Sequence, residues 1–265
     1  MKPALTNPSK LLDCSSRTST LRSLAASFGC SPSKVQAFVH DRFLEHDYEK
    51  SGGESEFSDW VYARACTRLG QPTLPTELYW FHGARVPDGT SYAEGLVPLG
   101  AWLPRLREAV LATLERSHER IAVEDAFNRE GGFGMHLRSK LKESIHWGPF
   151  ASLVREVYDE PRSTGMHDYL SMPEIIEDLC EDVRLASGLT LLPYFRSKWK
   201  PVVVKFTAPA ADRAQEALGT ALCYLHDCAF EGKPSECSNL FFDAGNELIP
   251  ADRIVCVEKV APRQR

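Results

Sequence analysis

The chain has 265 residues, of which 43% are hydrophobic and 25% are charged, and its formal net charge is −5. These values are typical of an ordinary protein with one large domain or two small ones, and they argue against a nucleic-acid coat or a binder of anionic membranes. No uncharged stretch approaches the ~20 apolar residues that a membrane span needs, so we expect no contact with the membrane interior.

The cysteines and the start of the chain indicate where the protein resides. The eight cysteines are scattered and form no Cys-x-x-Cys pair, as is typical of free thiols in a reducing compartment. Residues 1–20 contain prolines, serines and charges in place of the apolar core of a signal peptide. We therefore expect a cytoplasmic protein, with delivery as an effector by a non-Sec route as the alternative.

Hydrophobic periodicity predicts two regions along the chain. Residues 1–70 should form a small helical region and residues 75–265 a second domain. In the second domain the patterns predict strands at 77–86, 202–206 and 254–260, and helices at 103–121, 173–183 and 211–228. Pro104 falls in the first turn of the first predicted helix, where proline is tolerated. Because no regular β-α-β rhythm appears, we expect an α+β fold, with a split antiparallel sheet and flanking helices.

Residues 21–38 have the pattern of a helix-turn-helix. Gly29 would form the turn, Ser31 would cap the second helix, and a shared core would contain Leu24, Ala25, Phe28, Val35 and Phe38. The second helix carries a single lysine, Lys34, and any pair of antiparallel helices shows the same pattern. Two interpretations stay open: plain structural helices, or a nucleic-acid-binding regulator whose C-terminal domain is a sensor.

A motif of possible chemistry lies at the end of the predicted strand 77–86. His82 presents an imidazole there, and Gly83 lets a ligand approach the backbone closely, which suits recognition of a carboxamide. A second turn, Gly95-Leu96-Val97-Pro98, follows. The plain alternative is a histidine at the edge of the core.

These residues resemble the His-Tyr-Glu class of ADP-ribosyltransferases, which includes poly-ADP-ribose polymerases and diphtheria toxin. Members have a strand ending in His-Gly-Thr or similar and then a Gly-Leu-x-Pro turn. The match here is His82-Gly83-Ala84 with the turn at 95–98, and Ala84 replaces the usual hydroxyl residue. The resemblance implies that NAD is the substrate, that Gly83 holds its nicotinamide amide and His82 its adenosine-side ribose. It also places Arg85 among the NAD-binding residues.

The C-terminal segment is similar to the ending of the same family, where an Asn-Glu or similar pair carries the catalytic carboxylate. Here Asn246-Glu247 precedes Ile249-Pro250 and a final strand. A fixed carboxylate stabilises the oxocarbenium character that develops when an N-glycosidic bond breaks. The resemblance therefore implies that Glu247 is catalytic together with His82. Asp243 is the alternative if Gly245-Asn246 is a hairpin tip.

The family also needs an aromatic ring that stacks on nicotinamide, in a turn leading into a helix. The nearest match is Gly148-Pro149-Phe150-Ala151, with Phe150 where tyrosine is usual, and a phenylalanine keeps the stacking face. Tyr158 and Tyr169 are alternatives. The resemblance as a whole implies an enzyme that transfers ADP-ribose to a macromolecular acceptor, protein or nucleic acid, as a toxin, effector or defence protein. Ala84 and Phe150 leave a catalytically inactive interaction module as an alternative.

Three further clusters have plainer interpretations, and we expect no metal site. Acidic residues at helical spacing in 173–183 are expected to form a solvated helix face: Glu174, Glu177, Asp178, Glu181 and Asp182. Cys223, His226 and Cys228, with Cys237 nearby, are expected to fill a buried helix rather than bind zinc. Residues 131–134 are expected to form a flexible loop, and neighbouring cations could contact a pyrophosphate: Arg129, His136 and Arg138.

Overall fold

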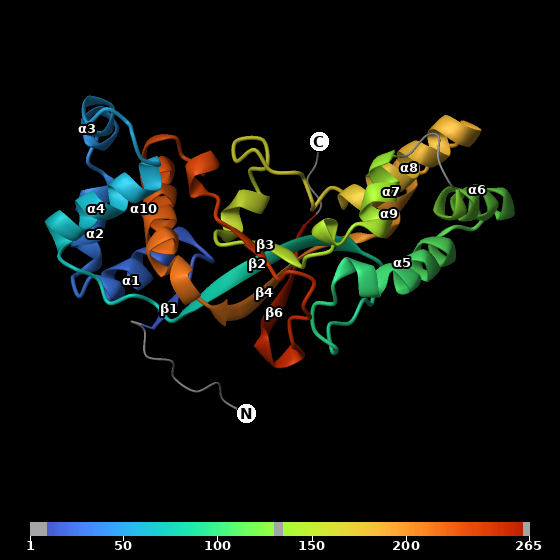
Figure 1. Cartoon of the computed structure of the whole chain (residues 1–265), viewed down its shortest axis with the longest axis horizontal. Coiled ribbons are helices and arrows are strands. Elements are labelled where there is room, and N and C mark those ends of the chain that lie inside the picture. Colours follow the sequence, from blue (N-terminus) through green and yellow to red (C-terminus); the bar gives the residue numbers. More distant parts are fainter. Residues whose placement is uncertain (1–9, 130–134, 262–265) are drawn as a thin grey trace. The chain divides into compact units, whose positions relative to one another are not determined.

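The computed structural model describes residues 10–129 and 135–261 (Figure 1). The glycine-rich loop expected at 131–134 and residues 1–9 lie outside this described part. The described residues form α-helices and one six-stranded sheet, so the α+β class predicted from the sequence is confirmed. No helix among them is both long and apolar enough to cross a membrane.

The sheet has the strand order β5-β3-β2-β4-β6, with β1 added beside β2. β2 runs antiparallel to β3, with Phe81 opposite Ser152, whereas the short β1 pairs with β2 in parallel, which the sequence did not predict. The predicted strand 77–86 coincides with β2, and the other two predictions lie in β4 and β6. The strands are β1 (Leu11–Leu12), β2 (Glu77–Val86), β3 (Phe150–Ser152), β4 (Lys200–Pro209), β5 (Phe241–Asp243) and β6 (Ile254–Lys259).

The helices and strands form two compact units. The first unit comprises residues up to 81 with 152–166 and 206–242, and the second comprises 82–151, 167–205 and the residues from 243 on. The sequence-based division into 1–70 and 75–265 stays a prediction. The helices are α1 (Arg17–Ser27), α2 (Pro32–Val39), α3 (Leu44–Lys50), α4 (Phe57–Leu69), α5 (Leu99–Thr113), α6 (Ser117–Asn128), α7 (Met135–Lys142), α8 (Glu174–Ser187), α9 (Leu192–Lys198) and α10 (Ala214–Phe230).

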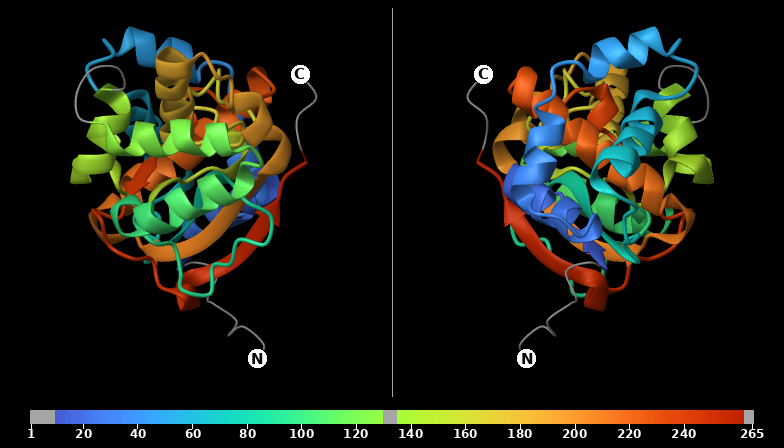
Figure 2. Two further views of the ribbon diagram at one scale, coloured as in Figure 1. Left: turned by 90° about the vertical axis from the view of Figure 1, so that its right-hand side faces the viewer. Right: turned by 90° about the vertical axis from the view of Figure 1, so that its left-hand side faces the viewer.

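The first unit is built around α10, which is buried over most of its length and packs against α4, α1 and α2 (Figure 2, right). The predicted helix pair is present: Gly29 has a φ of 60° in the turn, and the five predicted core side chains are buried. Cys223 and His226 are buried in α10, and His226 Nδ1 bonds to the Val39 carbonyl, 2.8 Å away. These residues therefore fill the core as expected, while DNA binding by the helix pair stays a prediction.

The second unit has an apolar core shared by α5, α6, α8 and α9 (Figure 2, left). The single helix predicted over 103–121 is wrong, because Leu114 is extended and separates α5 from α6. The apolar spacing continues across this break, so periodicity could not reveal it. Pro104 lies inside α5 rather than in its first turn, since the helix already begins at Leu99.

The acidic face of α8 is solvated only in part, because Glu181 is exposed whereas Asp182 is buried. Lys140 lies 3.1 Å from Glu174 and 2.6 Å from Asp178, while Arg129 lies 2.8 Å from Asp182, which is fully buried. Cations from neighbouring helices thus neutralise this face, and their partners are too distant in sequence for spacing to show. Among the described residues no cluster of three or more His, Cys, Asp and Glu side chains is arranged to hold a metal ion.

The close approach of α10 to α4 gives a stability prediction. A Cβ at Gly219 would lie 2.6 Å from the Ser58 carbonyl oxygen, so Gly219→Ala must push the two helices apart. We expect it to lower the free energy of unfolding by about 1–3 kcal/mol, measured by urea denaturation. Gln215→Ala, at an exposed position of the same helix, is the control and should change it by less than about 0.5 kcal/mol. Equal effects would contradict close packing at Gly219.

Candidate active site

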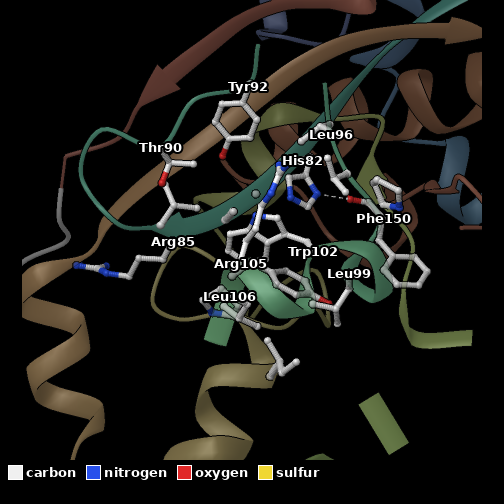
Figure 3. A pocket seen from close by; sticks show the side chains of 18 of the residues that line it. His82, Arg85, Thr90, Tyr92, Leu96, Leu99, Trp102, Arg105, Leu106 and Phe150 are labelled. Carbon is white, nitrogen blue, oxygen red and sulfur yellow. Dashed lines mark hydrogen bonds between the residues drawn. The ribbon is translucent and has the colours of Figure 1, made fainter. Parts of the chain in front are cut away.

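A cavity of about 270 Å³ lies within the second unit (Figure 3). Its wall is formed by the C-terminal half of β2, the loop that follows, the start of α5, the segment before β3 and the start of α8. The lining is rich in aromatic side chains: Tyr92, Trp102, Trp147, Phe150, Tyr169 and Trp199. Such a largely apolar hollow with a few polar groups is the usual form of a small-molecule site.

His82 lines this cavity, and its tautomer follows from its partner. It lies within β2, four residues before the strand ends, rather than at the strand end as predicted. Its Nδ1 is 2.7 Å from the carbonyl oxygen of Phe150 (dashed in Figure 3). Because a carbonyl only accepts, Nδ1 carries the proton and Nε2 is left as an acceptor. Burial lowers the pKa of His82, and the bond to Phe150 only partly opposes this, so the ring is neutral near pH 7.

Arg85 also lines the cavity, but its guanidinium is engaged by the protein. Its nitrogens donate to the carbonyl oxygens of Trp199 (3.1 Å), Leu170 (2.8 Å) and Arg196. Burial lowers the pKa of Arg85, and the charge of Arg196 adds to this effect. The geometry therefore favours a role in bracing these segments against β2, whereas the sequence predicted direct contact with NAD.

Of the three aromatic candidates, two face the cavity. Phe150 lines it from β3 and is 38% exposed, although the predicted turn into a helix is wrong because Phe150 starts a strand. Tyr169 also lines it, and its hydroxyl donates to Glu174 (3.2 Å). Tyr158 is buried elsewhere, in the first unit, with its hydroxyl donating to the Phe81 carbonyl (2.7 Å). Of these aromatic residues, Phe150 is therefore the one hydrogen-bonded to His82, through its backbone carbonyl.

Gly83 and Ala84 line the cavity beside His82, but Glu247 does not. Glu247 is exposed in the loop after β5. That loop is bonded to the cavity wall, because Ala244 N donates to the Pro149 carbonyl (3.1 Å) and Asn246 N to the Gly148 carbonyl (3.0 Å). The backbone next to Glu247 is thus bonded to the segment before β3, while the Glu247 side chain is exposed to solvent.

The alternative carboxylate, Asp243, has a local role. Its Oδ1 accepts a hydrogen bond from Gly245 N (2.8 Å), which closes the turn that leads to Glu247. Asn246 has a φ of 71°, the left-handed conformation that a hairpin tip uses. A turn therefore lies at Gly245-Asn246, with Glu247 directly after it. This turn is not the tip of a hairpin, because β5 pairs with β3 and β6 lies at the other edge of the sheet.

The turn at Gly95 joins the loop that follows β2 to the segment after Glu247. Leu96 N donates to the Ile249 carbonyl (2.9 Å), and Ile249 N donates back to Leu96 (3.1 Å). Gly95 has a φ of 97°, and a Cβ there would lie 2.1 Å from the Ile249 carbonyl oxygen. Only glycine fits this approach, which gives the predicted Gly-Leu-x-Pro turn its physical reason.

Several lining residues were missed by sequence reasoning. Tyr92 lies between the His82-Gly83 motif and the turn at 95–98, and this position in the sequence could have identified it as a lining residue. Trp102 lies in an amphipathic segment and Trp147 in a turn segment. The Trp147 ring packs against Gly100, where a Cβ would lie 2.3 Å from it. Trp199 had no local signal, because its place in the wall depends on β4 lying next to β2.

No protein-family model, curated protein or solved structure matches the chain. A functional assignment therefore has to come from the residues and geometry of the cavity.

Gly95 provides a matched test of the wall. Gly95→Ala should lower the free energy of unfolding by about 2 kcal/mol more than Gly89→Ala. Both glycines have positive φ, but nothing lies within 4 Å of a Cβ at Gly89, so the difference isolates the clash with Ile249. Urea denaturation midpoints of the two variants give the comparison. Similar midpoints would show that the loop does not approach Ile249 closely.

The lowered pKa of His82 predicts a pH effect on stability. The unfolded chain binds a proton at this residue near pH 6.5, whereas the folded protein does so only at lower pH. Stability therefore falls as the pH drops through about 6.5, and the loss from this residue stops below the folded pKa. We expect His82 to titrate below 6.5 by NMR, with its resonance assigned by comparison with His82→Gln. Titration at or above 6.5 would contradict a desolvated neutral ring.

Proposed function

We propose that the chain is an NAD-dependent ADP-ribosyltransferase that modifies a macromolecular acceptor. The observation that carries this proposal is the cavity that His82, Gly83 and Phe150 share, with the Glu247 loop hydrogen-bonded to its wall. These are four of the positions that the family resemblance singles out; a further one, Arg85, is engaged by backbone carbonyl oxygens. A cytoplasmic site of action, or delivery as an effector, belongs to the same proposal.

The lining fits part of NAD rather than all of it. A volume of about 270 Å³ lies just under the range of roughly 300–1,000 Å³ usual for ligand pockets, so it suits a ring and its ribose. Its cations are unavailable for a pyrophosphate: Arg85 donates to carbonyls, and Arg105 pairs with Glu94 at the exposed rim (2.8 Å). The phosphates would therefore lie outside the cavity.

Each residue would have a defined part in the transfer. With the phosphates outside the cavity, His82 Nε2 accepts a hydrogen bond from a hydroxyl of the nicotinamide-side ribose, in place of the adenosine-side ribose that the resemblance implies. The Phe150 face packs on the nicotinamide ring. The bond between C1′ of the ribose and the nicotinamide nitrogen breaks, and its electron pair leaves with neutral nicotinamide. The acceptor then forms a bond to C1′ and loses its proton. The negative charge of Glu247 stabilises the positive character at C1′ and orients the ribose.

The proposal is tested with NAD labelled in its adenylate half. The wild-type protein should release nicotinamide and pass label to an acceptor present in a cell lysate, and Glu247→Gln should lower the rate about a hundredfold. Asp243→Asn is the matched control, because it alters a neighbouring exposed carboxylate and keeps a side-chain oxygen for the turn. Its rate should stay within about twofold of the wild type.

Three results would each favour a different alternative. Absence of both nicotinamide release and label transfer by the wild type would favour an inactive interaction module, the alternative that Ala84 and Phe150 suggest. An unimpaired Glu247→Gln variant beside an impaired Asp243→Asn variant would move the catalytic role to Asp243. Binding of duplex DNA that falls steeply with salt would instead support the helix-turn-helix alternative.

A further inference from the structure

Most polar side chains in the cavity wall have protein partners. The indole N–H of Trp147 donates to the Lys140 carbonyl (2.9 Å), and that of Trp199 donates to the Thr113 hydroxyl (2.9 Å). The Arg85 guanidinium and the Tyr169 hydroxyl also donate to protein groups. These groups hold the wall together and leave little capacity for a ligand.

Tyr92 and Trp102 differ from these neighbours. Both side chains are half-buried in the wall, yet neither the Tyr92 hydroxyl nor the Trp102 indole N–H has a hydrogen-bond partner within residues 10–129 and 135–261. Burial alone raises the pKa of Tyr92 to about 12, so the phenol is neutral. Neither donor is among the fully buried polar atoms of the described residues that lack a partner, so both are accessible to a ligand that enters the cavity.

Hydrogen bonds hold the main chain at both Tyr92 and Trp102. The Tyr92 carbonyl accepts from Gly95 N (2.9 Å), within the turn that is bonded to Ile249. Trp102 lies in the first turn of α5, where its own N–H donates to the Pro98 carbonyl (3.0 Å). In Figure 3 Tyr92 lies above His82 and Trp102 below it. Tyr92, Trp102 and His82 thus line the same cavity.

We propose that Tyr92 and Trp102 contact the substrate and select an uncharged planar ring that carries a carboxamide. The carboxamide oxygen accepts from the Tyr92 hydroxyl or the Trp102 N–H, and a hydroxyl or amide N–H of the same ligand donates to His82 Nε2. In free nicotinamide, which has no ribose hydroxyl, the donor to His82 is the amide N–H, and nicotinate lacks it. This inference rests on the proposed function and names the residues that recognise the ring.

The test is calorimetric titration of the full chain with nicotinamide and with nicotinate. Tyr92→Phe and Trp102→Phe each keep an aromatic ring and lose a donor, so each should weaken nicotinamide binding about tenfold. Nicotinate should bind the wild type at least about tenfold more weakly than nicotinamide. Tyr48→Phe and Trp60→Phe, the same changes in α3 and α4, are the controls and should leave the affinity unchanged. Thermal unfolding of every variant checks that the fold is intact.

Each outcome bears on the inference separately from the proposed function. Loss of nicotinamide affinity in both cavity variants supports the inference even if NAD is never cleaved. Wild-type affinity in both variants, or no binding of nicotinamide by the wild type, overturns it even if NAD is cleaved. Equal affinity for nicotinate and nicotinamide also overturns it, because the selection of an uncharged ring would then be absent.

Discussion

The cavity depends on one buried cation. Arg85 lies in β2, and its guanidinium donates to carbonyls in the segments that hold Leu170, Arg196 and Trp199. Backbone carbonyls at these positions have no regular secondary-structure partner, and a buried unpaired carbonyl costs about 1–3 kcal/mol. One side chain therefore fixes the wall opposite α5. The same bonds engage the charge of Arg85, so it is not free to bind a ligand in the cavity.

The fold fixes the orientation of the His82 ring in the cavity wall. Its ring position is set by a backbone carbonyl of β3, so the pairing of β2 with β3 decides which nitrogen carries the proton. A strand pairing formed for stability thus determines the hydrogen bonds that a ligand must offer. Phe150 supplies both that carbonyl and an aromatic face, which joins the two functions in one residue.

The sequence predicted the elements whose signals are local. The strand 77–86 and the helix pair around Gly29 were predicted because alternation, apolar spacing and a turn glycine lie within a few residues. The break between α5 and α6 was missed because Leu114 continues the apolar spacing through an extended residue. The ion pairs on the acidic face of α8 were missed because Lys140 comes from α7 and Arg129 from the residue after α6.

The residues of the candidate site likewise differ in whether a local signal in the sequence predicted them. His82, Gly83 and Phe150 could be predicted because short motifs carry them, whereas the bracing role of Arg85 depends on carbonyls more than 80 residues away. The pair of backbone bonds between Leu96 and Ile249 has a mechanical consequence. The turn that carries Tyr92 and the stretch that follows Glu247 are joined by both bonds, so neither segment can separate from the other without breaking them.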